Sequence, residues 1–212
     1  MKSITLILVI ITISLSGIAQ EGNPPDFGFC IGINAGAGVS TPVTEVYETG
    51  AQWGMPWSFS VGTRIKLFYE VSIEATLFYK NAEVYDPTED FESTKTARNY
   101  YLLTASWYPG MSRTFYVKAG IGMASYTSYN KERPDQGPSD WPDQGNYGDN
   151  GVGTVLGVGY DLPVGKAYNN ITFGLSYYFI GLPTLKYDNI RIDEDPVLNH
   201  SLIFSVGYAM KM

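Results

Sequence analysis

The chain has 212 residues, of which 17% are charged and 15% aromatic, and 23 are glycines. This composition excludes a disordered chain, which would be poor in aromatic residues and rich in charge. A single cysteine excludes a disulfide framework or a cysteine-based zinc site, and a single histidine excludes most histidine chemistry. The net charge of −7 argues against a nucleic-acid partner, because nucleic acids attract basic surfaces.

The N-terminal segment predicts a secretory signal peptide. Lys2 precedes an apolar run from Ile4 to Ile13, which ends at the small residues Gly17 and Ala19. This run is too short for a transmembrane anchor, whereas its basic start and small-residue end are typical of a cleaved signal. We therefore expect residues 1–19 to be removed and residues 20–212 to form one domain.

Beyond the signal segment, apolar residues alternate with small or polar ones. A period of two is typical of strands that have one apolar face. Eight stretches follow this pattern, and we expect strands at 29–39, 57–69, 71–79, 100–108, 115–123, 152–162, 171–180 and 198–210.

The connections between these stretches alternate between short and long. Short connections are expected near 69–71, 109–113 and 163–168, and long ones at 42–56, 82–97, 130–150 and 181–197. Such alternation predicts an up-and-down meander that has tight turns at one end and loops at the other.

The size of the side chains on the two faces indicates which face is outside. In the fifth stretch the apolar face carries Phe115, Val117, Ile121 and Met123, whereas Gly120 and Gly122 lie on the opposite face. A soluble barrel of the lipocalin kind would have the polar face outside, and a surface so rich in glycine would be poorly soluble. The pattern favours an all-β fold: an eight-stranded antiparallel up-and-down transmembrane β-barrel with bulky residues in lipid.

Acidic residues are concentrated in the four long connections. These segments hold 16 acidic and 5 basic residues. We therefore expect four acidic loops on the outer side of the membrane, and the N-terminus and the short turns on the periplasmic side.

Two segments carry a family resemblance. The segment from Tyr100 to Gly120, with Trp107-Tyr108-Pro109 at its centre, resembles the middle hairpin of small Gram-negative outer membrane barrels. Gly157 to Leu162, followed by a Gly-Lys turn, resembles their next hairpin. The chain is similar to the OmpA/OmpX-type and PorT-like outer membrane β-barrel families, and the resemblance implies an outer membrane location and no single activity.

Six charged residues are expected to face the lumen. They are Arg64, Lys66, Glu74, Lys80, Lys118 and Asp161. Because a turn is expected near Glu70, Lys66 and Glu74 should be neighbours. The cluster is a candidate proton or ion path, but paired charges that fill the lumen are the simpler interpretation, since buried charges need partners.

No catalytic or cofactor-binding residues are predicted. His200 and Ser201 resemble two parts of a lipid deacylase triad, but adjacent residues of a strand point to opposite faces. Acidic loop residues are weak candidates for calcium ligands, since Asp is also common in plain turns. These candidates are Asp135, Asp140, Asp143, Asp149, Asp193 and Asp195.

We therefore expect a non-enzymatic outer membrane barrel with a structural or surface-recognition role and no large pore. Its partners would be outer membrane lipid and, through the loops, an extracellular ligand or a membrane complex. A barrel enzyme that modifies outer-leaflet lipid, or an accessory subunit of a secretion or uptake complex, is the alternative.

Overall fold

The computed structural model describes residues 27–41, 52–65, 69–82, 93–109, 114–131, 146–164, 169–187, 190–193 and 196–211. Its strands are β1 (Phe27–Ser40), β2 (Gln52–Ile65), β3 (Tyr69–Ala82), β4 (Ser93–Trp107), β5 (Phe115–Lys131), β6 (Asn146–Val164), β7 (Asn169–Leu182), β8 (Leu185–Tyr187), β9 (Ile190–Asp193) and β10 (Val197–Lys211). The expected signal peptide lies outside the described residues. Among those residues no helix has the length and hydropathy needed to cross a bilayer.

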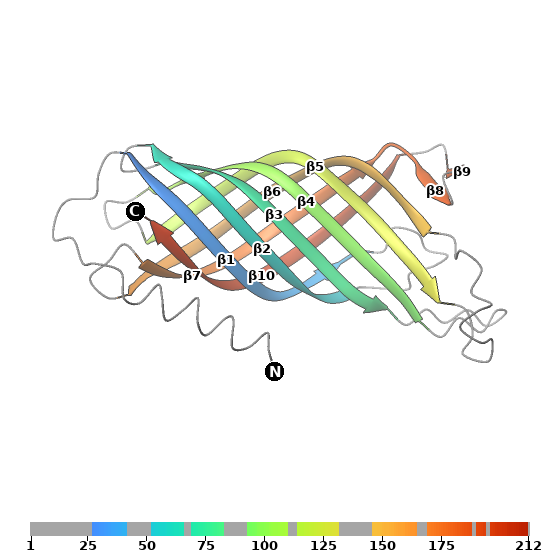
Figure 1. The fold of residues 1–212 in the computed structure, drawn as a ribbon, viewed down its shortest axis with the longest axis horizontal. Coiled ribbons are helices and arrows are strands. Elements are labelled where there is room, and N and C mark those ends of the chain that lie inside the picture. Colours follow the sequence, from blue (N-terminus) through green and yellow to red (C-terminus); the bar gives the residue numbers. More distant parts are fainter. Residues whose placement is uncertain are drawn as a thin grey trace.

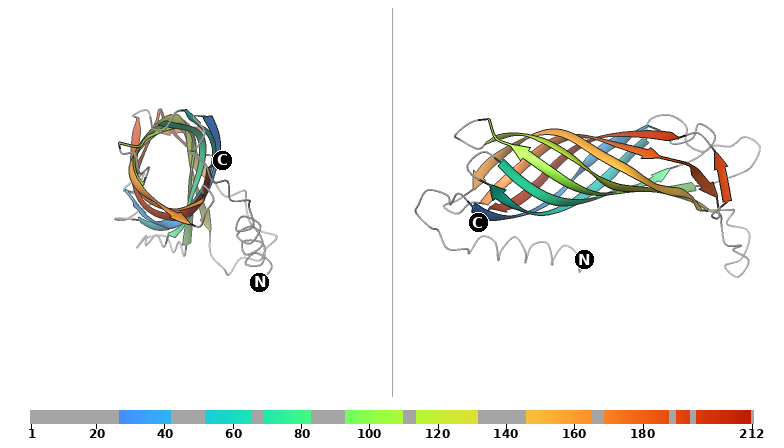
Figure 2. Two further views of the ribbon diagram at one scale, coloured as in Figure 1. Left: turned by 90° about the vertical axis from the view of Figure 1, so that its left-hand side faces the viewer. Right: turned by 90° about the horizontal axis from the view of Figure 1, so that it is seen from above.

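Eight long strands form one closed antiparallel sheet. The order is β5-β4-β3-β2-β1-β10-β7-β6, and pairing of β5 with β6 closes the ring. Figure 1 shows the strands inclined to the long axis, and the end-on view in Figure 2 shows the ring. Closure removes the free edges of the sheet, so backbone groups along the wall find partners in neighbouring strands. The predicted eight-stranded antiparallel up-and-down barrel is confirmed.

The first hairpin turns earlier than expected. Ile65 pairs with Tyr69, so the connection between β2 and β3 is residues 66–68 and not a turn near 69–71. A connection of three residues preserves the parity of the two strands, and both Ile65 and Tyr69 face outward. Alternation of apolar residues therefore runs through this turn without a break, and it could not locate the turn.

Four strands extend at least five residues further than expected towards the end of the barrel that carries the long connections, called here the loop end. β2 begins at Gln52, β4 at Ser93 and β6 at Asn146, while β5 continues to Lys131. The expected long loop at 181–197 also contains the hairpin of β8 and β9, which pairs with β6 through Tyr147 and Tyr187. About 9–11 residues suffice for a strand to cross a bilayer, so these 14- to 19-residue strands extend beyond that thickness.

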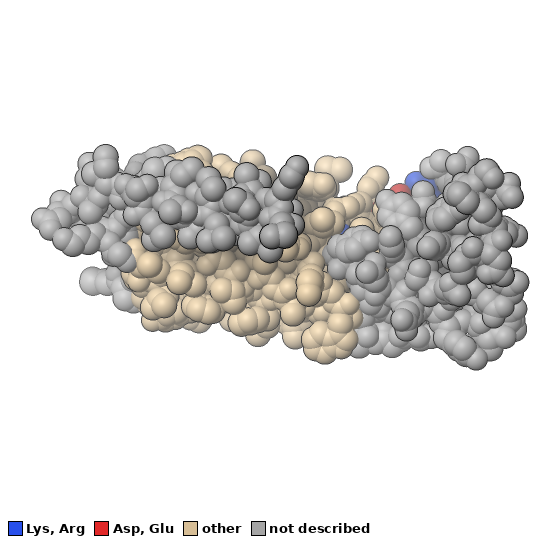
Figure 3. Space-filling model, turned by 60° about the horizontal axis from the view of Figure 1, so that its bottom comes forward, with Lys and Arg blue, Asp and Glu red and all other residues tan. Residues whose placement is uncertain are grey.

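Bulky apolar side chains face outward along the middle of the barrel. Ile73, Ile121 and Met123 are exposed over 69%, 60% and 67% of their surface. On one side of the barrel the described surface is uncharged over most of its length, and charged atoms are visible only towards the end with β8 and β9 (Figure 3). An outer wall of bulky apolar side chains is typical of barrels in lipid.

Aromatic residues mark both ends of this apolar belt. Near the short turns, Tyr69 pairs with Trp107 and Phe115 pairs with Tyr160, and all four side chains are exposed. Towards the loop end, the outward face of β2 carries Trp53 and Trp57, which are also exposed. Amphipathic rings at two levels suit the two interfaces of a bilayer.

The outward face predicts how the protein responds to charge. Ile121→Arg places a guanidinium in the apolar belt, and we expect it to lower the free energy of unfolding in lipid vesicles by about 2–4 kcal/mol. Thr127→Arg is the matched control, because Thr127 has the same parity on β5 and lies four residues nearer the loop end than the exposed Met123, and its expected cost is about 0–1 kcal/mol. Equal costs in urea titrations would contradict the assignment of the outer face.

Candidate functional site

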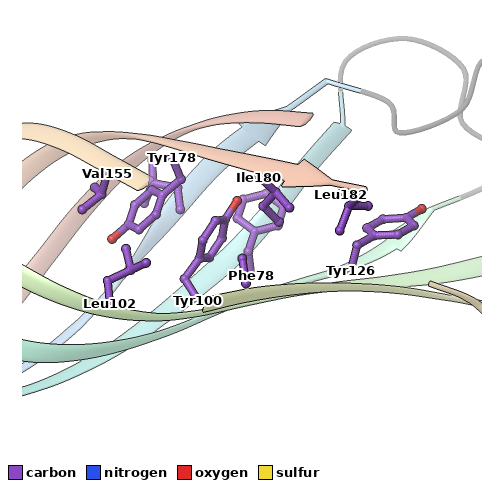
Figure 4. Close-up of a cluster of buried hydrophobic side chains, with 10 residues drawn as sticks. Phe78, Tyr100, Leu102, Tyr126, Val155, Tyr178, Ile180 and Leu182 are labelled. Carbon is purple, nitrogen blue, oxygen red and sulfur yellow. The ribbon is translucent and has the colours of Figure 1, made fainter. Parts of the chain in front are cut away.

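The lumen contains an apolar layer towards the loop end, called here the apolar plug. Side chains from opposite walls point towards one another and fill this part of the barrel (Figure 4). The buried members are Phe78, Tyr100, Leu102, Ala124, Tyr126, Val155, Tyr178, Ile180, Leu182 and Ile203. The rings of Tyr100 and Tyr178 lie 4.7 Å apart between centroids. The plug therefore fills this part of the lumen with packed side chains.

Glycines on the inner face make room for aromatic rings that point into the lumen. A methyl group on Gly38 would lie 2.7 Å from Cε2 of Phe78, and one on Gly159 would lie 2.2 Å from Cζ of Tyr116. Both distances are far below van der Waals contact. The inward glycines of the sequence therefore compensate for large aromatic side chains on other strands.

Arg98 crosses the lumen at the loop end of the plug. Its guanidinium, which is fully buried, donates from Nε to Oδ1 of Asn199 on β10 at 2.8 Å, and from Nη2 to the carbonyl of Thr41 at 3.3 Å. It also lies over the rings of Tyr126 and Phe78, at 5.2 and 5.8 Å from their centroids. Strands β4 and β10 lie on opposite sides of the ring, so these bonds join opposite walls.

On the side of the plug that faces the short turns, Glu74 and Lys118 form a buried ion pair. Nζ of Lys118 lies 2.7 Å from Oε2 of Glu74, and Oε1 of Glu74 accepts hydrogen bonds from Tyr178 at 2.5 Å and from Thr76 at 3.1 Å. Both carboxylate oxygens are thus occupied. A buried charge needs such a counter-ion and such hydrogen bonds to offset the free-energy cost of removing it from water.

A second ionic cluster lies nearer the short turns. Nζ of Lys211 on β10 lies 2.6 Å from Oδ2 of Asp161 on β6 and 3.0 Å from Oε2 of Glu70 on β3. Tyr108 donates to Asp161 at 3.0 Å and accepts from Lys211. One ammonium therefore bridges two carboxylates that come from distant strands.

A polar cavity of about 60 Å³ separates the two clusters. Its lining includes Asn34, Ser60, Lys118, Asp161 and Lys211. Oδ1 of Asp161 and Nη1 of Arg64 are buried and have no hydrogen-bond partner among the described residues. A cavity of this size holds only a few water molecules. Cys30, the single cysteine, is also buried on the inner face.

The structure brings four of the six predicted lumen charges inside. Arg64, Glu74, Lys118 and Asp161 are inward or half-buried. Lys66 lies outside the described residues, and the side chain of Lys80 is not described. The expected neighbourhood of Lys66 and Glu74 therefore stays untested. Within the described residues, Glu74 lies opposite Ser60 in the register, and its ion-pair partner is Lys118.

Three inward charges were missing from the prediction. They are Glu70, Arg98 and Lys211. Glu70 and Lys211 lie at strand ends, and Arg98 lies in the part of β4 that precedes the expected start at residue 100. Extending the inward parity by one or two residues would have found Arg98 and Lys211.

Only two of the predicted calcium candidates fall on described residues. Asp149 accepts hydrogen bonds from Thr184 at 2.5 Å and from Lys186 at 3.1 Å, and thereby ties β6 to the segment around β8. Asp193 ends β9, and its side chain is not described. Asp135, Asp140, Asp143 and Asp195 lie outside the described residues. Within the described part of the chain, no three His, Cys, Asp or Glu side chains gather as metal ligands.

His200 and Ser201 face opposite sides of β10, as the sequence predicts. Ser201 is buried in the lumen, where its hydroxyl lies 3.5 Å from that of Tyr100. His200 lies on the outer wall, and its Nδ1 is 2.5 Å from the hydroxyl of Tyr177. The two side chains therefore do not form a base and nucleophile pair.

Comparison with known proteins bears on the fold. No protein-family model and no curated protein matches the chain. Among solved structures, Neisserial surface protein A matches with a TM-score of 0.52 at 14% identity, covering 87% of this chain and 97% of that one. The outer membrane protein OprG from Pseudomonas aeruginosa matches with a TM-score of 0.51 at 13% identity, covering 89% and 98%.

The chain has the fold of the small outer membrane β-barrels. At these identities the likeness concerns the fold alone, so the work of the protein has to be argued from its own residues.

The lumen ion pair yields a thermodynamic prediction. Lys118→Met leaves the Glu74 carboxylate buried without its cation, and we expect a loss of about 3–5 kcal/mol in unfolding free energy. The double variant Glu74→Leu with Lys118→Met removes both charges and should recover most of that loss. Urea unfolding in vesicles, followed by tryptophan fluorescence, measures both. Additive losses in the double variant would contradict the pairing.

Proposed function

We propose that this protein is a non-enzymatic outer membrane barrel that is closed to solutes and works through its loop end. The observation that carries the proposal is the filled lumen. The apolar plug occupies one part, and in the other part the charged groups of each ionic cluster pair within that cluster. Within the described residues, little lumen chemistry is left for transport or catalysis.

The outer membrane location rests on two supports. The outward apolar belt with aromatic residues at its two ends suits a bilayer. The two solved structures with the same fold are named as a surface protein and an outer membrane protein. The predicted signal peptide at 1–19 would provide export, and the short turns would then face the periplasm.

The surface role rests on the distribution of charge. Of the 21 acidic residues in the sequence, 16 lie in the four segments that we expected to be long loops. Connections on a rigid scaffold tolerate sequence change and commonly carry recognition. We infer that the loop end binds a cationic ligand, a basic protein surface or divalent cations that bridge it to anionic lipid headgroups.

The closed lumen predicts electrical behaviour. Reconstituted in planar bilayers, the protein should give no stable conductance steps of porin size, because the plug spans the lumen. A purified porin in the same bilayers serves as the positive control. Recurrent large steps would overturn the closed-barrel proposal.

The role of the longest acidic connection can be tested separately from the barrel. The shortened segment has to be 132–145, because residues 146–149, which we expected to lie in the loop, pair with β5 and β8. Replacing 132–145 with a short Gly/Ser turn should preserve heat-modifiable migration on gels, since the described sheet does not include those residues. The same change should abolish calcium-dependent binding to vesicles of anionic lipid.

A charge control separates shape from electrostatics. Asp135, Asp140 and Asp143 changed to Asn keep the length of the segment and remove three negative charges. If the Asn variant retains full vesicle binding, the acidic charge is not the recognition element. If the shortened protein fails to assemble, this connection is part of the folded barrel.

A further inference from the structure

The outer wall of the barrel has a narrow apolar slot. Ala75 on β3 lies between two aromatic residues in the sheet, since it pairs with Phe59 on β2 and with Tyr101 on β4. One small side chain between two rings leaves a depression of about 210 Å³. Trp57 and Leu77 form part of its lining towards the loop end.

A polar pair lies beside the slot on the same outward face. Asn99 belongs to the slot lining, and its Nδ2 donates to Oγ of Ser125 on β5 at 3.2 Å. The register places this pair one row closer to the loop end than Ala75 and Tyr101. That bond uses neither Oδ1 of Asn99 nor the hydroxyl proton of Ser125, so both can meet a neighbouring polar group.

The slot and the polar pair together are complementary to a lipid molecule. An acyl chain is apolar and narrow and ends at a polar linkage and headgroup. The slot is continuous with the lipid-facing belt, so a chain enters it sideways without crossing a polar barrier. A protein partner would need roughly 800 Å² on each side, far more than one slot between two rings provides.

We propose that this slot binds one acyl chain of a membrane lipid whose polar linkage lies beside Asn99 and Ser125. The polar pair lies towards the loop end, so the lipid belongs to the leaflet on that side. The inference rests on the proposed membrane location, and it goes beyond it by assigning a lipid site to one sector of the wall.

Ala75→Phe fills the slot and keeps the outer face apolar. Ala119→Phe is the matched control, because Ala119 is an exposed alanine of the same parity on β5 and is not part of the slot. Both variants enlarge an outward alanine by the same ring. Any general effect of bulk on folding or insertion should therefore be shared, and heat-modifiable migration checks that both barrels form.

The full chain is reconstituted in vesicles that contain a phosphatidylethanolamine with a diazirine on one acyl chain. After photolysis, mass spectrometry maps the labelled residues. We expect labelling to concentrate on peptides around residues 57–59, 75–77 and 99–101. Ala75→Phe should reduce this labelling by about tenfold, the equivalent of losing about two buried methylene contacts, while Ala119→Phe leaves it unchanged.

The possible results distinguish failure of the proposed lipid slot from failure of the proposed membrane location. Labelling spread around the whole wall in proportion to exposed area, or equal labelling of Ala75→Phe and wild type, overturns the slot and leaves the membrane location in place. Absence of labelling on every outward strand overturns both.

Discussion

The narrow lumen of a closed eight-stranded barrel determines which side chains can lie on the inner and outer faces of this molecule. Eight strands enclose a lumen only wide enough for side chains to fill it. Each large inward ring therefore requires a small residue on another strand, as Gly38 permits Phe78 and Gly159 permits Tyr116. The same limit forces other bulky apolar side chains to the outside, where lipid accommodates them. One geometric constraint thus accounts for the glycine-rich inner face and for the aromatic outer one.

Inside this narrow space, the described ion pairs join charged groups from different strands. The carboxylate of Glu74 on β3 forms an ion pair with the ammonium of Lys118 on β5, and Asp161 on β6 forms one with Lys211 on β10. Such pairs are weak sources of stability compared with apolar residues of equal volume, but breaking one is costly. They consequently destabilise any other register of the strands, because a shift of one residue would move an inward charged side chain to the face that contacts lipid.

The sequence predicted the architecture well because alternation is strong where lipid lies on one side and the lumen on the other. Its errors fall at strand ends. The turn after Ile65 preserves parity, so it was invisible to the pattern, and Glu70 was placed in a turn instead of opposite Arg64. Arg98 was missed because the residues of β4 beyond the belt are polar on both faces. Ion pairing could not be predicted, since neighbours across a lumen depend on stagger around the ring.

The place of Lys211 on the final strand of the barrel bears on the order in which the ring is completed. Its ammonium pairs with both Asp161 and Glu70 and offsets one of their two negative charges, and β10 joins β1 to β7. An open sheet made of β1 to β7 alone would carry both carboxylates without this counter-ion. Docking of β10 therefore closes the wall and supplies a positive charge between two carboxylates in one step, which makes incomplete barrels electrostatically distinct from finished ones.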